Sequence, residues 1–147
     1  MSTRLKLDVT GIAETGLIFL NGDLMETVLI DEVGQMDYVF EEFNELKRTV
    51  MKIERINPEL RLTCILWKPT YENDEVAEPL VCGNQHPTEG WGYSPMNDAM
   101  KKACGGEYSV FTRENGPTSN YFPIYNSDNE TVGFMELLSN VKVRVDI

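Results

Sequence analysis

The sequence predicts a single α+β domain, a mostly antiparallel sheet packed by one long amphipathic helix at about residues 35–57 and one short helix at about 95–104. The chain of 147 residues has a common length for one domain with its own apolar core. Its hydrophobic fraction of 41% is typical of a folded protein rather than of a disordered acidic tail. One segment repeats apolar residues at the helical period, and most others are short and bounded by turn residues, as in strands.

The first elements are expected to be a strand and a β-hairpin. Apolar and charged residues alternate over residues 4–9, which predicts a half-buried strand. Two apolar segments, residues 17–20 and 24–30, flank Asn21-Gly22. Because Asn-Gly tolerates the positive φ angles of a tight turn, this pattern predicts a hairpin.

The clearest helix follows the expected hairpin. Apolar residues recur at alternating spacings of three and four from Met36 to Ile53, which predicts a broad apolar face against a sheet. Pro58 marks the end, because its ring does not fit the interior of a helix. Acids occupy the first half of this segment and bases the second half, an order that suits the helix dipole.

The middle of the chain is expected to hold one buried strand and one irregular segment. Residues 61–67 form a nearly continuous apolar run that Pro69 stops, which predicts a buried strand. The stretch at about 69–93 combines acids, prolines and glycines with little periodicity, so we expect an irregular acidic excursion within the single domain of residues 1–147. Connections of this length are often functional.

The last third of the chain is expected to be a short helix followed by β structure. Ser94 is the expected N-cap, Pro95 the first helical residue, and Gly105-Gly106 the end. Four strands are then predicted, at residues 108–112, 121–125, 131–137 and 141–147.

The charge of the chain is large and unevenly distributed. The net charge is −11. No Lys, Arg or His occurs between Lys6 and Lys47, although this stretch carries ten acids, and only His86 interrupts a second basic-free stretch between Lys68 and Lys101. Such a charge disfavours direct binding to nucleic acid or to an anionic membrane, and it favours a basic protein partner.

The ends and the hydropathy of the chain predict a cytoplasmic location. No apolar run approaches the roughly 20 residues that span a bilayer. The N-terminus enters the expected strand at once, without the pattern of a signal peptide. The sequence leaves the oligomeric state open, and a homo-oligomer is one of the alternatives.

No residue pattern identifies a reaction, a metal or a cofactor. Cys82 and His86 could begin a zinc site or pair as nucleophile and base, but a zinc site needs more ligands at close spacing. The three cysteines are too few and too widely spaced for a disulfide framework. One alternative stays open, a small ligand-binding domain or enzyme with a pocket near Cys82, Asn84, His86 and Trp91.

The leading hypothesis is a non-catalytic acidic inhibitor that docks on a basic, nucleic-acid-binding surface of a larger protein. Carboxylates can take the place of phosphates opposite Lys and Arg. The basic half of the long helix makes that helix alone a poor phosphate mimic, so docking through the excursion is a variant of the same hypothesis. The expected partner-binding residues are Asp23, Glu26, Asp31, Glu32, Asp37, Glu41, Glu42, Glu45, Glu72, Asp74, Glu75, Glu78, Trp91 and Tyr93.

In its small size, its acidity and its lack of catalytic motifs, the chain resembles phage-encoded inhibitors of host defence nucleases, including anti-CRISPR proteins. This resemblance is one of composition and covers no defined segment. It implies a DNA mimic that blocks an anti-phage complex. A further alternative is a viral structural component that assembles through its terminal strands.

Overall fold

The computed structural model describes residues 8–27, 41–69, 75–83 and 94–139. The helices are α1 (Val9–Phe19), α2 (Gly22–Thr27), α4 (Glu41–Glu54), the 3-10 helix η1 (Pro58–Leu60) and α5 (Asp98–Cys104). The strands are β1 (Leu62–Pro69), β2 (Val76–Cys82), β3 (Ser94–Pro95), β4 (Ser109–Thr112), β5 (Thr118–Tyr125) and β6 (Thr131–Ser139). The six strands form one curled antiparallel sheet in the order β3-β2-β1-β6-β5-β4, which confirms the predicted α+β class.

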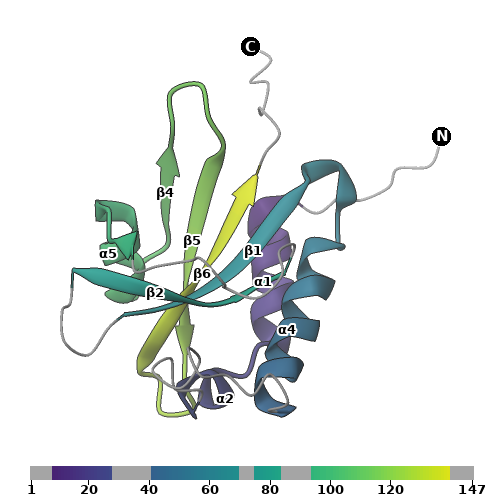
Figure 1. Ribbon diagram of the computed structural model, residues 1–147, viewed down its shortest axis with the longest axis vertical. Coiled ribbons are helices and arrows are strands. Elements are labelled where there is room, and N and C mark those ends of the chain that lie inside the picture. Colours follow the sequence, from purple (N-terminus) through teal and green to yellow (C-terminus); the bar gives the residue numbers. More distant parts are fainter. Residues whose placement is uncertain (1–7, 28–40, 70–74, 84–93, 140–147) are drawn as a thin grey trace.

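Helices cover both faces of this sheet (Figure 1). Helices α1 and α4 pack on one face, where Ile12 and Val50 meet strand residues such as Leu66. Helix α5 packs on the other face, where Met100 meets Trp67. Strand β1 is therefore buried on both sides, which explains why its sequence is a continuous apolar run rather than an alternating one.

The predictions for β1, α5 and the described part of the long helix are confirmed, with small shifts of their bounds. In α4 the buried residues Leu46, Val50 and Ile53 follow the predicted period. The N-cap of α5 is Asn97 rather than Ser94, because the Asn97 side chain accepts a hydrogen bond from the N–H of Met100. Ser94 instead belongs to β3, which pairs with β2.

The predicted hairpin around Asn21-Gly22 is wrong, because this region is helical. The Asp8 side chain caps α1 by accepting from the N–H of Gly11, and Asn21 accepts from the N–H of Leu24 at the start of α2. Gly22 meets the backbone of Tyr125 so closely that a Cβ would overlap it. A glycine that suggested a turn is therefore needed for a close helix–strand contact.

Part of the expected irregular excursion is a strand. Residues 76–82 form β2 and pair with β1, with an irregularity in register between Leu66 and Trp67. Pro79 stands opposite Trp67 at this irregularity, a position where the sheet tolerates proline. The rest of the excursion and the expected strands at residues 4–9 and 141–147 lie outside the described residues, except that Asp8 precedes α1 and Val9 begins it.

Candidate functional site

Exposed acids gather where α2 meets the turn between β5 and β6. The Asp23 carboxylate accepts from the N–H and the hydroxyl of Ser127, at 2.9 and 3.1 Å. The Asn126 amide lies 3.2 Å from a carboxylate oxygen of Glu130 and 3.4 Å from one of Glu26. These contacts join two segments that are about a hundred residues apart in the chain. We call the exposed acids of these two segments the acidic end: Asp23, Glu26, Asp128 and Glu130.

Figure 1 shows α2, the β5–β6 turn and the first turn of α4 at the same end of the molecule. Helix α4 begins there with Glu41 and Glu42, and Glu45 follows as an exposed residue of the same helix. The fold thus brings the N-terminal half of α4, which contains Glu41, Glu42 and Glu45, to the same end as the acids of α2. The basic half of α4 lies at the opposite end of the helix.

One lysine lies inside the molecule next to the acidic end. Lys68 is only 5% exposed, and its Nζ donates to the backbone oxygen of Glu26 at 3.1 Å. In the β1–β2 ladder it stands opposite Glu78, which is 7% exposed. Burial lowers the pKa of Lys68, and the charges of Glu26 and Glu78 oppose this effect.

The other predicted partner-binding residues differ in their exposure, and several of them lie outside the described residues. Glu78 is buried and is therefore not available to a docking partner, because it lies in β2 opposite Lys68. Glu75 is exposed, and its backbone oxygen accepts from the N–H of Met96. Outside the described residues lie Asp31, Glu32, Asp37, Glu72, Asp74, Asn84, His86, Trp91 and Tyr93.

Sequence reasoning did not select Asp128 and Glu130 for the acidic end. The strands predicted at residues 121–125 and 131–137 leave these acids in the connection between them, and such connections are usually exposed. What the sequence could not show is that this connection lies against α2, since no local pattern reports a contact between segments so far apart.

A buried carboxylate links three strands on the face of the sheet that α5 covers. Glu136 of β6 is 5% exposed and accepts from the indole N–H of Trp67 at 2.8 Å and the hydroxyl of Ser119 at 2.6 Å. The guanidinium of Arg113 donates in turn to the Ser119 hydroxyl at 2.9 Å. Among the described residues every buried polar side-chain atom has a hydrogen-bond partner. Glu136 therefore stabilises the sheet, because its burial is offset by these donors.

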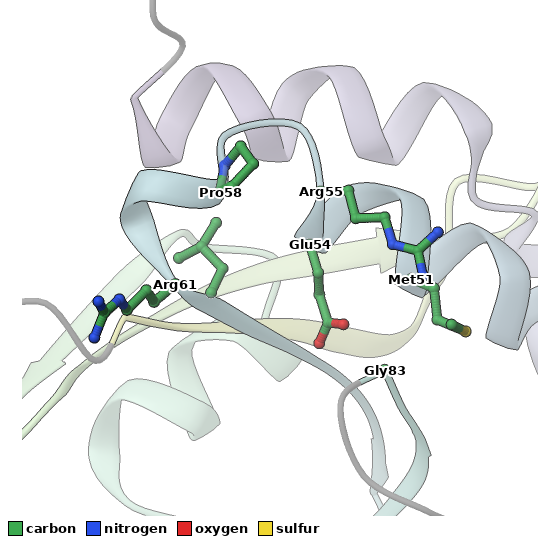
Figure 2. A pocket seen from close by; sticks show the side chains of 7 residues that line it. Met51, Glu54, Arg55, Pro58, Arg61 and Gly83 are labelled. Atoms are coloured by element: carbon green, nitrogen blue, oxygen red, sulfur yellow. The ribbon is translucent and has the colours of Figure 1, made fainter.

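A pocket of about 480 Å³ lies between the end of α4, the start of β1 and the end of β2 (Figure 2). Glu54 forms its polar side. This side chain is 9% exposed, and one carboxylate oxygen accepts from the N–H of Cys64 at 2.8 Å. The N–H of Gly83 donates to the backbone oxygen of Cys64 at 3.0 Å. The Glu54 carboxylate therefore lies beside the last backbone hydrogen bond between β1 and the residue that follows β2.

Among the described residues there is no cluster of metal ligands, and Cys64 is not an activated thiol. They contain no group of three His, Cys, Asp or Glu side chains that could hold a metal ion. Cys64 and Cys82 are buried and are not joined in a disulfide, and burial raises the pKa of Cys64 well above its usual value, with Glu54 acting in the same direction. A thiol that keeps its proton is a poor nucleophile. In this part of the chain no helix is both long and apolar enough to cross a membrane.

Comparison with known proteins assigns this chain to no family. The sequence matches no protein-family model, and it has no match among the curated proteins.

Proposed function

We propose that the chain is a non-catalytic interaction protein that docks through its acidic end on a basic surface of a larger protein. The observation that supports this proposal is the gathering of Asp23, Glu26, Asp128 and Glu130 from two distant segments on one exposed surface. The hydrogen bonds found for these carboxylates come from the neutral groups of Ser127 and Asn126. The charge of Glu26 also acts on the buried Lys68, so the charge offered to a partner comes mainly from Asp23, Asp128 and Glu130.

The partner that best fits this surface is a protein that binds nucleic acid. Such a protein presents Lys and Arg at the spacing of phosphates, and carboxylates can accept the same charge-assisted hydrogen bonds. A protein with a net charge of −11 approaches such a channel quickly and occupies it in place of nucleic acid. The consequence is inhibition of a nucleic-acid-processing complex, the role of an anti-defence protein that mimics DNA.

The test is competitive binding. The chain is immobilised, partners are captured from host lysate and identified, and the dissociation constant of each is measured in about 50 to 500 mM salt, a range over which screening changes strongly. We expect a nucleic-acid-binding protein whose affinity falls with salt and which duplex DNA displaces.

Two charge-neutralised variants locate the contact. The first combines D23N, E26Q, D128N and E130Q, and we expect it to bind at least about tenfold more weakly, because several charge pairs of about 0.2–1 kcal/mol are lost together. The matched control combines E14Q, E59Q, E107Q and E114Q, exposed acids elsewhere on the molecule. Equal losses in both variants, or a partner that DNA does not displace, would contradict the proposal.

A further inference from the structure

The two edges of the sheet differ in their protection against pairing with a further strand. One edge is β3, which consists of Ser94 and Pro95, and proline lacks the N–H that a further strand needs. The other edge is β4, on the outer side of β5 (Figure 1), and its four residues include no proline and no charge. In the described part of the chain β4 pairs only with β5, so its outer side offers backbone N–H and C=O groups to a further strand.

Exposed side chains lie on one face of this edge. Tyr108, just before β4, is 50% exposed, and Val110 is 44% exposed. The two share a face, because the Tyr108 hydroxyl donates at 2.8 Å to Asn120, which stands opposite Val110 in the β4–β5 ladder. Helix α5 packs on the other face, where the Ser109 hydroxyl donates to the backbone oxygen of Ala99. A strand added at this edge would therefore cover apolar surface as well as backbone groups.

Charge does not oppose a contact between two copies of the chain at this edge. The whole chain has a net charge of −11, so most surfaces of two copies repel each other. Residues 94–125, which include α5, β4 and β5, instead carry equal numbers of acids and bases: Asp98, Glu107 and Glu114 against Lys101, Lys102 and Arg113. This neutral region favours a second copy over the basic partner that suits the acidic end.

The sequence around β4 is complementary to itself in the antiparallel direction. In a two-fold symmetric pair centred on Val110, that residue meets its own copy, and Tyr108 meets Thr112. The same register places Glu107, just before this segment, opposite Arg113, just after it. Opposite charges therefore meet at both ends of the paired segment, where like charges would destabilise it.

Arg113 can meet a second copy while it keeps its bonds within the chain. Its Nη1 donates to the backbone oxygen of Pro117 at 3.0 Å and to the Ser119 hydroxyl at 2.9 Å. The Nε and Nη2 groups of the guanidinium carry the remaining donors. A register centred on Phe111 would instead place Arg113 opposite the buried Ser109, so the charges favour the register centred on Val110.

We infer that β4 is the contact through which two copies of this chain form a dimer, by antiparallel β4–β4 pairing centred on Val110. Backbone hydrogen bonds join the two sheets edge to edge, and Tyr108 and Val110 become less exposed. A strand of four residues buries less than the roughly 1,200 Å² of a stable interface, so the dimer is weak and forms only at high protein concentration.

The test is sedimentation equilibrium of the full chain at protein concentrations between about 1 and 300 µM, a range that covers a dissociation constant of about 10–100 µM. We expect the mass to rise from 16.7 kDa towards twice that value. A monomer at every concentration, the result if another segment of the chain or a different protein occupies the edge, would overturn the inference.

Two lysine substitutions locate the contact. V110K brings two lysines opposite each other at the two-fold axis, and we expect it to weaken the dimer at least about tenfold. The matched control is I18K, because Ile18 is an apolar residue of α1 that is 77% exposed, and this variant should dimerise as the natural chain does. Circular dichroism and a thermal melt check that both variants fold. An equal dimer in folded V110K, or an equal loss in I18K, would contradict the inference.

A charge reversal tests the register. E107R sets an arginine opposite Arg113 at both ends of the pair, and we expect it to weaken the dimer about fivefold or more. The matched control is E59R in η1, which changes the net charge of the chain by the same amount and should not weaken the dimer. Because both variants reduce the general repulsion between copies, a loss in E107R alone reports the contact at β4. Equal dimerisation of the two variants would refute the register.

This inference goes beyond the docking proposal and does not depend on it. The acidic end is formed by α2 and the β5–β6 turn, whereas the dimer contact is β4 (Figure 1). The neutralised variant D23N/E26Q/D128N/E130Q should therefore dimerise at least as tightly as the natural chain, and V110K should keep its affinity for the captured protein.

Discussion

At the scale of single residues, the buried Glu136 shows why a charged side chain can occupy the middle of a sheet. Its carboxylate receives hydrogen bonds from Trp67 and Ser119, which stand on the two neighbouring strands. Removing the carboxylate leaves those donors buried and without their acceptor. The cost of an unsatisfied buried group is about 1–3 kcal/mol.

We predict that E136A lowers the free energy of unfolding by about 2–5 kcal/mol, the range for breaking a buried polar network. E136Q should cost less, because its amide oxygen still accepts from Trp67 and the Ser119 hydroxyl can turn to accept from its amide group. Urea denaturation of the two variants and the natural chain measures the difference. Equal stability of E136A and E136Q would show that the hydrogen bonds contribute little.

The buried thiol of Cys64 leads to a prediction about alkaline pH. Burial raises its pKa, and the charges of Glu54, Cys82 and Glu136 act in the same direction. Above about pH 8.5 the unfolded chain therefore releases this proton while the folded protein retains it. Stability is then lost as the pH rises, with a slope of at most about 1.4 kcal/mol per pH unit from this group.

We predict that C64A shows a shallower loss of unfolding free energy than the natural chain between about pH 8 and 10. The small cavity that alanine leaves adds a cost that does not depend on pH, so the slope rather than the absolute stability is the readout. Denaturation at several pH values measures it. The same slope in both proteins would contradict the role of Cys64, although Tyr121, whose pKa burial also raises, adds to the loss at higher pH.

At the scale of elements, α5 has two candidate N-cap residues, Ser94 and Asn97. The sequence favoured Ser94, which lies in β3, whereas the side chain of Asn97 accepts from Met100 at 2.8 Å and contacts the Tyr121 hydroxyl at 3.5 Å. The helix starts after Asn97 because Ser94 and Pro95 are held by pairing with β2.

We predict that N97A lowers the free energy of unfolding by about 0.5–2 kcal/mol, the cost of losing an N-cap. The matched control is S94A, which removes a hydroxyl that donates to the backbone oxygen of Pro95 at 3.3 Å. This control should change the stability by less than about 0.5 kcal/mol, as for other surface substitutions. Chemical denaturation compares the two. A larger loss of unfolding free energy in S94A than in N97A would indicate that Ser94, as the sequence predicted, is the N-cap.

At the scale of the whole molecule, the fold separates charges of opposite sign along α4. The acidic end gathers Asp23, Glu26, Asp128 and Glu130, whereas Lys52 in the last turn of α4, Arg55 just after α4 and Arg61 just after η1 lie towards the other end of α4. This polarity gives the described part of the chain two ends of opposite charge.

We predict that raising NaCl from about 10 to 500 mM increases the unfolding free energy by roughly 1 kcal/mol, because salt screens the repulsion among exposed acids. The variant D23N/E26Q/D128N/E130Q should show a smaller increase. Thermal and urea unfolding at both salt concentrations measure the effect. If the matched control E14Q/E59Q/E107Q/E114Q reduces the increase as much, the repulsion is spread over the molecule rather than concentrated at the acidic end.

The fold class, β1, the described part of α4, α5 and the C-terminal strands up to β6 followed from the order of amino acids alone. Each depends on a local cause, the apolar period or a turn residue, which acts over a few neighbours. The same local reasoning failed at Asn21-Gly22, where contact with Tyr125 overrides the tendency to turn, and at Val76–Cys82, where pairing with β1 organises a segment without periodicity.

The candidate sites depended on contacts that no local pattern records. The acids of α2 were visible in the sequence, but Asp128 and Glu130 join them only because the β5–β6 turn packs against α2. Likewise the sequence predicted Glu78 as an exposed acid, but strand pairing buries it opposite Lys68. Glu54 lines a pocket because the fold places Gly83, from a distant segment, beside its carboxylate. Charge pattern and periodicity are properties of residues that are neighbours along the chain, whereas exposure and proximity between distant segments arise only when helices and strands pack together.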